Sequence, residues 1–461
     1  KDDRIIMSTR IRQKNGWESY KAILALAIPI IIQNLFSAAV SSADVIMLNS
    51  VGQSAVSASS LAVQYTNVLY MIFYGLGTGS TMLCAQYWGK KDLRAIAKVE
   101  GIALRFALGF SILFAVPAAA IPETMMRLFT EDQELICLGG QYLRIISISY
   151  LCWGVSEIYL SVLRSIERVR ISMLLNVTAL LLNIILNAVF VFGLFGAPKM
   201  GIRGVALATS TSRAVQLIAS LVVSAFSKDV KLQFRLMFEK SGVLLKDFVR
   251  LSLPALGNDV IWSVAFSMYS VIMGHMGSDV VAANSLVVVV RNFSTVFCFA
   301  IASAGGIYIG KRIGANEIEE AKEDARKTLK LTVFTGIIGG VIILIVSPFV
   351  IHFATFNETA MGYLKIMLLI NVYYIMGGAV NTTLIAGVFR SGGDSRFGFI
   401  CDIIDMWVYA VPLGFFAAFV LKLPPMVVYF LLCTDEFVKW PWVIKHYRSM
   451  KWLKNITRDE I

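Results

Sequence analysis

Four polar residues stand inside long apolar stretches of the chain, at spacings that suit ion binding. Asp44 has no basic residue within twenty positions. Asn183 and Asn187 are four residues apart and therefore share one face of a helix. Counted at 1.5 Å per residue from the outer end of each stretch, Asp44 lies about 9 Å deep, Asn187 about 13 Å and Thr209 about 12 Å. One carboxylate with amides and a hydroxyl at one depth predicts a proton or cation pocket, with a purely structural polar cluster as the alternative.

Further acids lie within apolar stretches, where a charge costs several kcal/mol and is a candidate for function. Asp259, Asp402 and Asp405 are reserve candidates for ion coupling or for holding charge. Glu157 and Asp259 lie near the inner ends of their stretches, where snorkelling or a water-filled vestibule can solvate them. They rank below Asp44 because they lack its companion amides.

The composition indicates which kind of protein positions these residues. Hydrophobic residues make up 57% of the 461-residue chain and charged residues 16%, with a mean hydropathy of +0.71. A soluble domain carries about 25% charge, so this composition indicates a polytopic membrane protein. No segment alternates as the strands of a barrel do, so we expect an all-α fold. Twelve transmembrane helices are predicted, beginning near Tyr20, Ser54, Leu93, Gln133, Ile171, Gly201, Lys246, Asp279, Ile318, Thr359, Arg396 and Pro425.

Lys and Arg are distributed unequally between the loops. The two terminal segments and alternate loops hold 33 of them, the last group running from Lys439 to Arg458, while the other loops hold five. By the positive-inside rule, both termini are expected in the cytoplasm. The excess of 42 Lys and Arg over 30 Asp and Glu therefore indicates contact with the lipid bilayer and not with nucleic acid. We expect a multi-pass protein of the cell membrane.

A shift of 225 residues brings the two halves of the sequence into register. The matching residues are Pro29 and Pro254, Gly52 and Gly277, and Gly89 and Gly314. Six helices in each half give both halves one orientation, as in secondary transporters that rock two pseudo-symmetric lobes about a central cavity. The predicted parts are a cytoplasmic N-terminal segment (1–19), an N-lobe (20–224), a cytoplasmic linker (225–250), a C-lobe (246–445) that begins within the linker, and a cytoplasmic tail (446–461).

Several kinds of chemistry lack their residues in this sequence. It has no Walker-type phosphate loop, no HExxH motif and no GxSxG motif, and its loops are too short for a catalytic domain, so we do not expect an enzyme. His275, His352 and His446 are far apart, so neither a metal site nor another cofactor is expected. The six cysteines form no CxxC pair and are interpreted as packing residues.

Several motifs together resemble the multidrug and toxic compound extrusion (MATE) family, in its bacterial form. In the first half they are Pro29, Asp44 and Gly52, Gly75-Leu76-Gly77-Thr78-Gly79 before Gln86 and Gly89, and the stretch from Asn183 through Gly193, Gly196 and Pro198 to Thr209. In the second half they are Arg390-Ser391-Gly392-Gly393-Asp394 and Trp407 with Pro412. The resemblance covers essentially the whole chain.

This resemblance implies an antiporter that exports cationic or amphiphilic organic compounds in exchange for protons or sodium. It also implies an ion site made by an acid in span one, an Asn-x-x-x-Asp pair in span five and a Thr in span six. Asp44, Asn183 and Thr209 match that pattern, while Asn187 stands where Asp is usual. The Glu that some relatives carry in span seven is absent, and Asp259 is the nearest acid.

We interpret the coupling ion as the proton, because one carboxylate is neutralised by a proton more simply than it completes a sodium shell. Small-molecule substrates and the bilayer are the expected partners, and the chain is expected to act as a monomer. Aromatic and methionine side chains suited to cationic drugs are candidates for the substrate route, with helix packing as the alternative. They are Phe36, Tyr65, Tyr150, Trp153, Met268 and Tyr269.

Two other classes of membrane protein remain open. A lipid-linked-oligosaccharide flippase of related architecture would need cationic groups for pyrophosphate, which Arg105, Arg213 and Arg291 could supply. For these arginines we favour ion pairs that hold two helices together. A channel is the second class, and it would conduct ions without exchanging a substrate.

Overall fold

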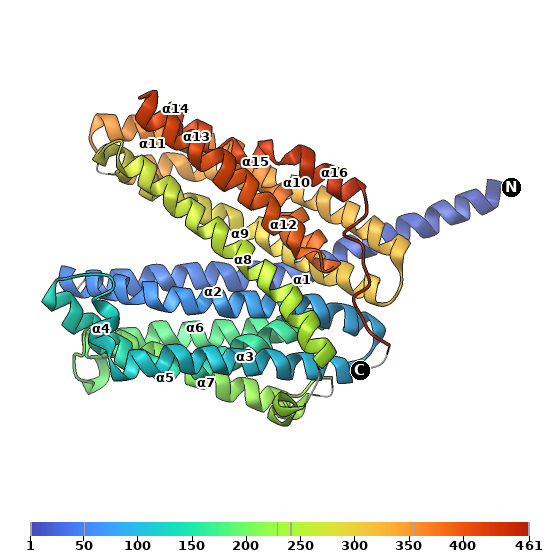
Figure 1. The fold of residues 1–461 in the computed structure, drawn as a ribbon, viewed down its shortest axis with the longest axis horizontal. Helices are drawn as coiled ribbons and strands as arrows, with labels where there is room; N and C mark the ends of the chain where they lie inside the picture. The colour runs from blue at the N-terminus through green and yellow to red at the C-terminus, as the bar shows by residue number, and fades with distance from the viewer. Residues whose placement is uncertain (1, 50, 228, 240–241, 355, 460–461) are drawn as a thin grey trace. The chain divides into compact units, whose positions relative to one another are not determined.

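The computed structural model describes residues 2–49, 51–227, 229–239, 242–354 and 356–459, and Figure 1 traces the chain. Within these residues every regular element is a helix. Eleven helices among them are long and apolar enough to cross a membrane. The predicted all-α membrane fold is therefore confirmed.

The first half of the chain forms a bundle of long helices (Figure 1). Two of them begin at an aspartate whose side chain satisfies free backbone groups of the first turn: Asp92 accepts from the Ala95 N–H at 2.9 Å, and Asp132 from the Glu134 N–H at 2.9 Å. The elements are α1 (Asp2–Asn49), α2 (Gln53–Lys90), α3 (Leu93–Ala120), α4 (Pro122–Met126), α5 (Gln133–Ser165), α6 (Val169–Phe192), η1 (Leu194–Gly196) and α7 (Ile202–Phe226).

The second half repeats this order and contains three π-helical stretches. The elements are η2 (Phe234–Phe238), α8 (Gly242–Gly274), α9 (Ser278–Gly314), α10 (Ile318–Phe353), α11 (Glu358–Thr382), η3 (Thr383–Phe389), α12 (Ser395–Asp402), η4 (Ile403–Ala410), α13 (Val411–Phe415), η5 (Phe416–Val420), α14 (Pro425–Leu432), α15 (Asp435–Val438) and α16 (Trp440–Arg448). The π-helical stretches are η3, η4 and η5. Such wider turns are frequent at functional sites.

The segment predicted as a twelfth span differs from expectation. It begins at Pro425 as predicted, but it consists of three short helices, α14, α15 and α16, and not of one long one. Pro441 lacks the N–H that would continue the hydrogen-bond ladder from α15 into α16. The other eleven spans begin within four residues of their predicted starts.

The internal repeat is visible in the helix boundaries. The helices α2 and α9, α3 and α10, and α5 and α11 begin 225 residues apart, and α6 and α12 begin 226 apart. Gly52 and Gly277 precede α2 and α9 with φ angles of 143° and 128°, a backbone conformation that favours glycine. A Cβ at either position would meet no atom within 4 Å, so the backbone angle and not crowding requires glycine there.

The chain divides into two compact units. The N-terminal unit comprises Ile32–Ser252 with the residues from Arg458 onwards, and the C-terminal unit comprises the residues up to Ile31 with Leu253–Thr457. In the N-terminal unit α2, α3 and α7 pack on α5, and in the C-terminal unit α10 and α11 pack on α9. The cytoplasmic segments and lobe boundaries named above stay predictions.

Candidate functional site

The four residues predicted to bind an ion lie together in the N-terminal unit. Nδ2 of Asn187 on α6 donates to Oδ1 of Asp44 on α1 at 2.5 Å and to Oδ1 of Asn183 at 3.1 Å. Nδ2 of Asn183 then donates to Oγ1 of Thr209 on α7 at 3.1 Å. We call this the polar row; it joins three helices through side chains alone.

The polar row leaves few oxygen atoms free. Oδ1 of Asn183 and Oγ1 of Thr209 both accept hydrogen bonds within the row. Oδ1 of the fully buried Asn187 has no hydrogen-bond partner among the described residues. Asp44 and the Asn187 carbonyl group are therefore the groups best placed to meet an ion or a proton.

The substrate-route candidates of the N-terminal unit take part in its packing. Tyr150 is fully buried and shares a 2.9 Å hydrogen bond with Thr66. The Tyr65 hydroxyl donates to the Phe114 carbonyl group at 2.9 Å. Trp153 stacks on Tyr70 with ring centroids 5.8 Å apart. In the C-terminal unit, Met268 and Tyr269 lie in or against the hydrophobic core, and Phe36 on α1 is half-buried.

The C-terminal unit contains a buried charge network that the sequence analysis did not find. Nζ of Lys439 lies 3.4 Å from a carboxylate oxygen of each of Asp402, Asp405 and Glu436. The neighbouring Asp435 accepts a 2.9 Å hydrogen bond from the Tyr269 hydroxyl. None of these five charged residues is more than 4% exposed. Four carboxyl groups thus surround one ammonium group in a nearly dry site.

Two expectations are corrected by this network. The charge count placed Lys439 in a cytoplasmic loop, and this is wrong, because Lys439 is 2% exposed and faces carboxylates. Asp435 and Glu436 were overlooked among the membrane-embedded acids. The available signal was the pair Asp402 and Asp405, because two acids on one apolar segment require a counter-charge from another helix.

The reserve acid Asp259 is engaged in an ion pair. Nη2 of the buried Arg390 lies 2.8 Å from Oδ1 of Asp259 and 2.9 Å from Oδ1 of Asn258. At the corresponding position of the first half, Arg164 pairs with Glu157 at 3.1 Å. The sequence analysis also missed Glu100 on α3, whose two buried carboxylate oxygens have no hydrogen-bond partner among the described residues.

The expected ion pairs of three arginines are not found among the described residues. Nε of Arg105 donates instead to the Met237 carbonyl group at 2.6 Å. Nη1 of Arg213 donates to Oε1 of Gln216 at 3.0 Å, and its guanidinium lies 4.7 Å from the Trp153 ring centroid. Arg291 lies over the Phe266 ring at 4.8 Å. Carbonyl groups, an amide and aromatic faces replace the predicted carboxylates.

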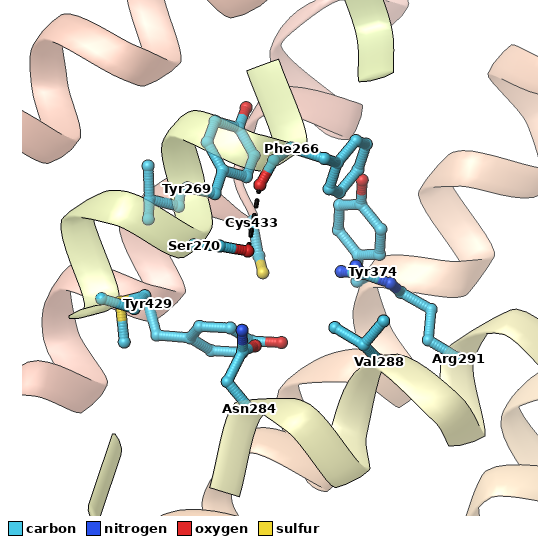
Figure 2. A pocket seen from close by; sticks show the side chains of 11 residues that line it. Phe266, Tyr269, Ser270, Asn284, Val288, Arg291, Tyr374, Tyr429 and Cys433 are labelled. Atoms are coloured by element: carbon cyan, nitrogen blue, oxygen red, sulfur yellow. Dashed lines mark hydrogen bonds between the residues drawn. The ribbon is translucent and has the colours of Figure 1, made fainter. Parts of the chain in front are cut away.

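Arg291 also lines a cavity in the C-terminal unit, which Figure 2 shows from close by. Its volume is about 20 Å³, which is room for about one water molecule. Helices α8, α9, α11 and α14 supply most of its wall. The lining residues are Phe266, Tyr269, Ser270, Met273, Asn284, Val288, Arg291, Tyr374, Tyr429, Leu432 and Cys433.

Groups of acids, histidines and cysteines suited to a metal ion are absent from the part of the chain that the structure describes. The buried carboxylates of the C-terminal unit face Lys439, whose ammonium group occupies the centre that a cation would need.

Comparison with known proteins relates both halves of the chain to one family. The MatE family model matches residues 29–189 and 254–416. The transporter YisQ of Bacillus subtilis is 23% identical over 94% of this chain and 95% of its own length. The probable multidrug resistance protein YoeA of the same organism is 26% identical, covering 88% of each chain.

Solved structures agree on the fold. A crystal structure of MATE in the straight conformation superposes with a TM-score of 0.84 at 20% identity, covering 94% of this chain and 97% of that one. At this identity the likeness concerns the fold alone. The family model, in contrast, matches most of the sequence, in two segments that mirror the internal repeat. The chain therefore belongs to the MatE family of multidrug efflux transporters, the multi-pass membrane proteins whose motifs its sequence resembles.

Proposed function

We propose that the chain is an antiporter of the cell membrane that exports cationic or amphiphilic organic compounds in exchange for protons. The observation that carries this proposal is the polar row, because it places one carboxylate, Asp44, against the amide of Asn187 inside the N-terminal unit. A carboxylate in such a place can be charged or neutral, and only the charged form attracts a cationic compound.

The cycle follows from this property of Asp44. With the transporter open to the outside, a proton neutralises the carboxylate, and a bound cationic compound loses its electrostatic attraction and leaves. After the lobes change conformation, the cytoplasmic side removes the proton and restores the charge. Proton and compound thus compete for one group, and this competition couples their movements.

The oxygen count of the polar row supports the proton over sodium. Sodium is a hard cation that needs several oxygen ligands and negative charge to replace its water. The row offers one carboxylate, and the Asn183 and Thr209 oxygens already accept hydrogen bonds. A proton needs only Asp44, and it removes the buried charge altogether.

Purified protein in proteoliposomes tests the coupling ion. With sodium absent, an imposed pH gradient should drive uptake of a fluorescent cationic dye, and Asp44→Asn should stop it. The exposed Glu131→Gln is a matched control that should transport normally. Asn187→Asp should increase dependence on sodium, because it restores a second carboxylate. Uptake that requires sodium and ignores the pH gradient would refute the proton assignment.

We further propose that both termini and the linker face the cytoplasm and that the chain acts as a monomer. In a background without native cysteines, a cysteine replacing the exposed Lys231 should resist an impermeant thiol reagent on intact cells. A cysteine replacing the exposed Glu131 should react with it. The opposite pattern would reverse the orientation. Light scattering of the purified protein in detergent tests the monomer.

A lipid-linked-oligosaccharide flippase is the second candidate function, and Arg291 in the cavity wall favours it. Arg105 and Arg213 weaken it, because the first is bonded to carbonyl groups and the second to an amide and a ring. One arginine supplies one positive charge, whereas a pyrophosphate carries at least two negative charges. Binding of a labelled cationic dye against a labelled pyrophosphate lipid separates the two functions.

A further inference from the structure

We propose that the cavity in the C-terminal unit is a subsite for the carboxylate group of an amphiphilic substrate, with Arg291 as its main ligand. This inference rests on the proposed transport function and extends its substrate class from cations to zwitterions and organic acids. Nothing in the family assignment requires such a subsite, because the polar row alone accounts for cation export.

The fold brings the donor groups of the cavity together from two helices. Asn284, Val288 and Arg291 are spaced by four and three residues on α9 and therefore share one face of that helix. Figure 2 shows these side chains around the cavity, with Tyr429 from α14 across from them. The backbone spacing thus holds a guanidinium and a carboxamide on one wall.

Arg291 is held in the wall without an acidic partner. No carboxylate oxygen within 4.0 Å and no hydrogen-bond acceptor is recorded for it among the described residues. Its guanidinium instead lies 4.8 Å from the Phe266 ring and 5.7 Å from the Tyr374 ring. Aromatic faces stabilise such a charge by about 0.5–2 kcal/mol but accept none of its five N–H hydrogen bonds in the plane of the group.

Other cations of the same unit show what a purely structural charge looks like. Arg390 is paired with Asp259 at 2.8 Å, and Lys439 lies among three carboxylates. A charge kept inside a membrane protein without such a partner is a candidate for ligand binding. A planar guanidinium binds a planar carboxylate through two parallel hydrogen bonds, which is its strongest recognition mode.

The remaining wall residues complete an anion-binding geometry. The carboxamide of Asn284 has no hydrogen bond among the described residues, so its N–H groups can donate to a ligand. The Tyr429 oxygen accepts from Nδ2 of Asn371 at 2.7 Å, and its hydrogen is left for the Cys433 sulfur or a ligand. The Ser270 hydroxyl donates to the Phe266 carbonyl group at 3.2 Å, the dashed line in Figure 2.

The acids nearest to the cavity are engaged behind its wall. Asp435 accepts from the Tyr269 hydroxyl at 2.9 Å, and Glu436 from the Tyr374 hydroxyl at 3.3 Å. Glu436 also lies 3.4 Å from Nζ of Lys439. The two tyrosines therefore separate these acids from the lining, and Arg291 supplies the positive charge of the wall itself.

Size and charge select a single carboxylate group. A volume of about 20 Å³ admits one small group and excludes a whole drug molecule or a pyrophosphate. One guanidinium balances one negative charge. Phe266 and Tyr374 offer aromatic faces beside the group, which suits a carboxylate attached to an aromatic ring.

The test compares a rhodamine zwitterion that has a free carboxylate with its methyl ester, which is a plain cation. Full-length protein is used, for binding in detergent by fluorescence anisotropy and for transport in proteoliposomes. Arg291→Gln should weaken binding of the zwitterion about tenfold or more and change binding of the ester less than about twofold. Arg291→Lys should recover only part of the loss, because an ammonium lacks the planar fork.

Arg213→Gln is the matched control, because Arg213 also lies over an aromatic ring within the membrane region. It should leave the ratio between the two probes unchanged. Asn284→Ala should weaken the zwitterion about threefold and spare the ester. Thermal unfolding of each variant identifies any that fail to fold.

The outcomes separate this inference from the proposed function. Equal loss of both probes in Arg291→Gln and Arg291→Lys, with normal folding, overturns the subsite and makes Arg291 structural. Unchanged zwitterion binding in both variants overturns it as well. If wild-type protein binds the zwitterion through Arg291 but transports neither probe, the subsite stands and the proposed export function fails.

Discussion

The two halves of the molecule place different chemistry at matching positions of the repeat. Asn176 and Asp402 are the eighth residues of α6 and α12, and Gln216 and Lys439 are each the fifteenth residue from the starts of α7 and α14. In the N-terminal unit Nε2 of Gln216 donates to Oδ1 of Asn176 at 3.0 Å. In the C-terminal unit Lys439 meets Asp402 at 3.4 Å, with Asp405 and Glu436 beside it.

This difference shows that the fold does not require charge at that position. A neutral amide pair satisfies the same helix contact without the cost of burying ions. The same comparison applies to Asp44, whose counterpart 225 residues later is Tyr269. There the buried acid is Asp435, on the last segment of the unit, and Tyr269 donates to it. The first half thus has a single acid beside amides, and the second half has several acids around a lysine.

The largest effect is expected from Asp44→Asn, measured against Tyr269→Phe. An amide of similar shape cannot change its charge, so efflux of a cationic dye from cells should fall to the level of cells without the protein. Tyr269→Phe removes only a hydrogen bond to Asp435 and should leave partial efflux. Full dye efflux by well-expressed Asp44→Asn would contradict the assignment of the polar row.

A large loss of stability is expected from Lys439→Met, measured against Gln216→Met. Removing the ammonium leaves three carboxylates without a counter-charge, so the free energy of unfolding should fall by about 3–5 kcal/mol. Gln216→Met leaves the amide of Asn176 without one partner and should cost about 1–3 kcal/mol. Chemical unfolding in detergent provides the measurement. Equal losses in the two variants would show that the charges of the C-terminal network do not matter to stability.

A neutral or slightly stabilising effect is expected from Asp405→Asn. Both oxygens of Asp405 lack hydrogen-bond partners among the described residues, and four carboxyl groups share one ammonium. Removing one negative charge relieves repulsion, so the free energy of unfolding should stay equal or rise by about 1 kcal/mol. Dye efflux should fall less than in Asp44→Asn, and the same holds for Asp402→Asn. Complete loss of efflux in folded Asp405→Asn would move ion coupling to the C-terminal unit.

The smallest effects are expected at Asp394 and Arg168, which precede α12 and α6. Burial alone would raise the pKa of Asp394, but the hydrogen bond from His446 and the positive charges of Lys454 and His446 hold it below its ordinary value. Its stabilisation is therefore complete above about pH 4 and is lost as the pH falls through the lowered value. Asp394→Asn should lower stability by up to about 1 kcal/mol at neutral pH.

Arg168 serves as the comparison for Asp394. It pairs with Asp229 at 2.6 Å, but its side chain is 52% exposed, whereas that of Asp394 is 14% exposed. Arg168→Gln should therefore change stability by less than about 0.5 kcal/mol. Thermal unfolding between pH 7 and acidic pH measures both variants. A larger loss for Arg168→Gln would show that exposure does not rank these two pairs.

The sequence by itself determined the class of the fold and the first of these sites. Long apolar segments bounded by charged clusters can only cross a membrane as helices, so eleven spans began within four residues of their predicted starts. Asp44 and the two asparagines were recognised because spacing and depth along a helix are local quantities that can be counted. Pro29 and Gly52, repeated as Pro254 and Gly277, disclosed the two halves in the same way.

Only the tertiary structure decided which distant charges meet. Lys439 is 37 residues from Asp402, and its burial depends on how the segment after Pro425 packs against α12 and η4. Nothing in its local sequence distinguishes it from the lysines of the tail. The same holds for Arg291, for which the sequence favoured an ion pair. Whether an arginine meets a carboxylate or faces a cavity depends on helix rotation and packing, which non-local contacts determine.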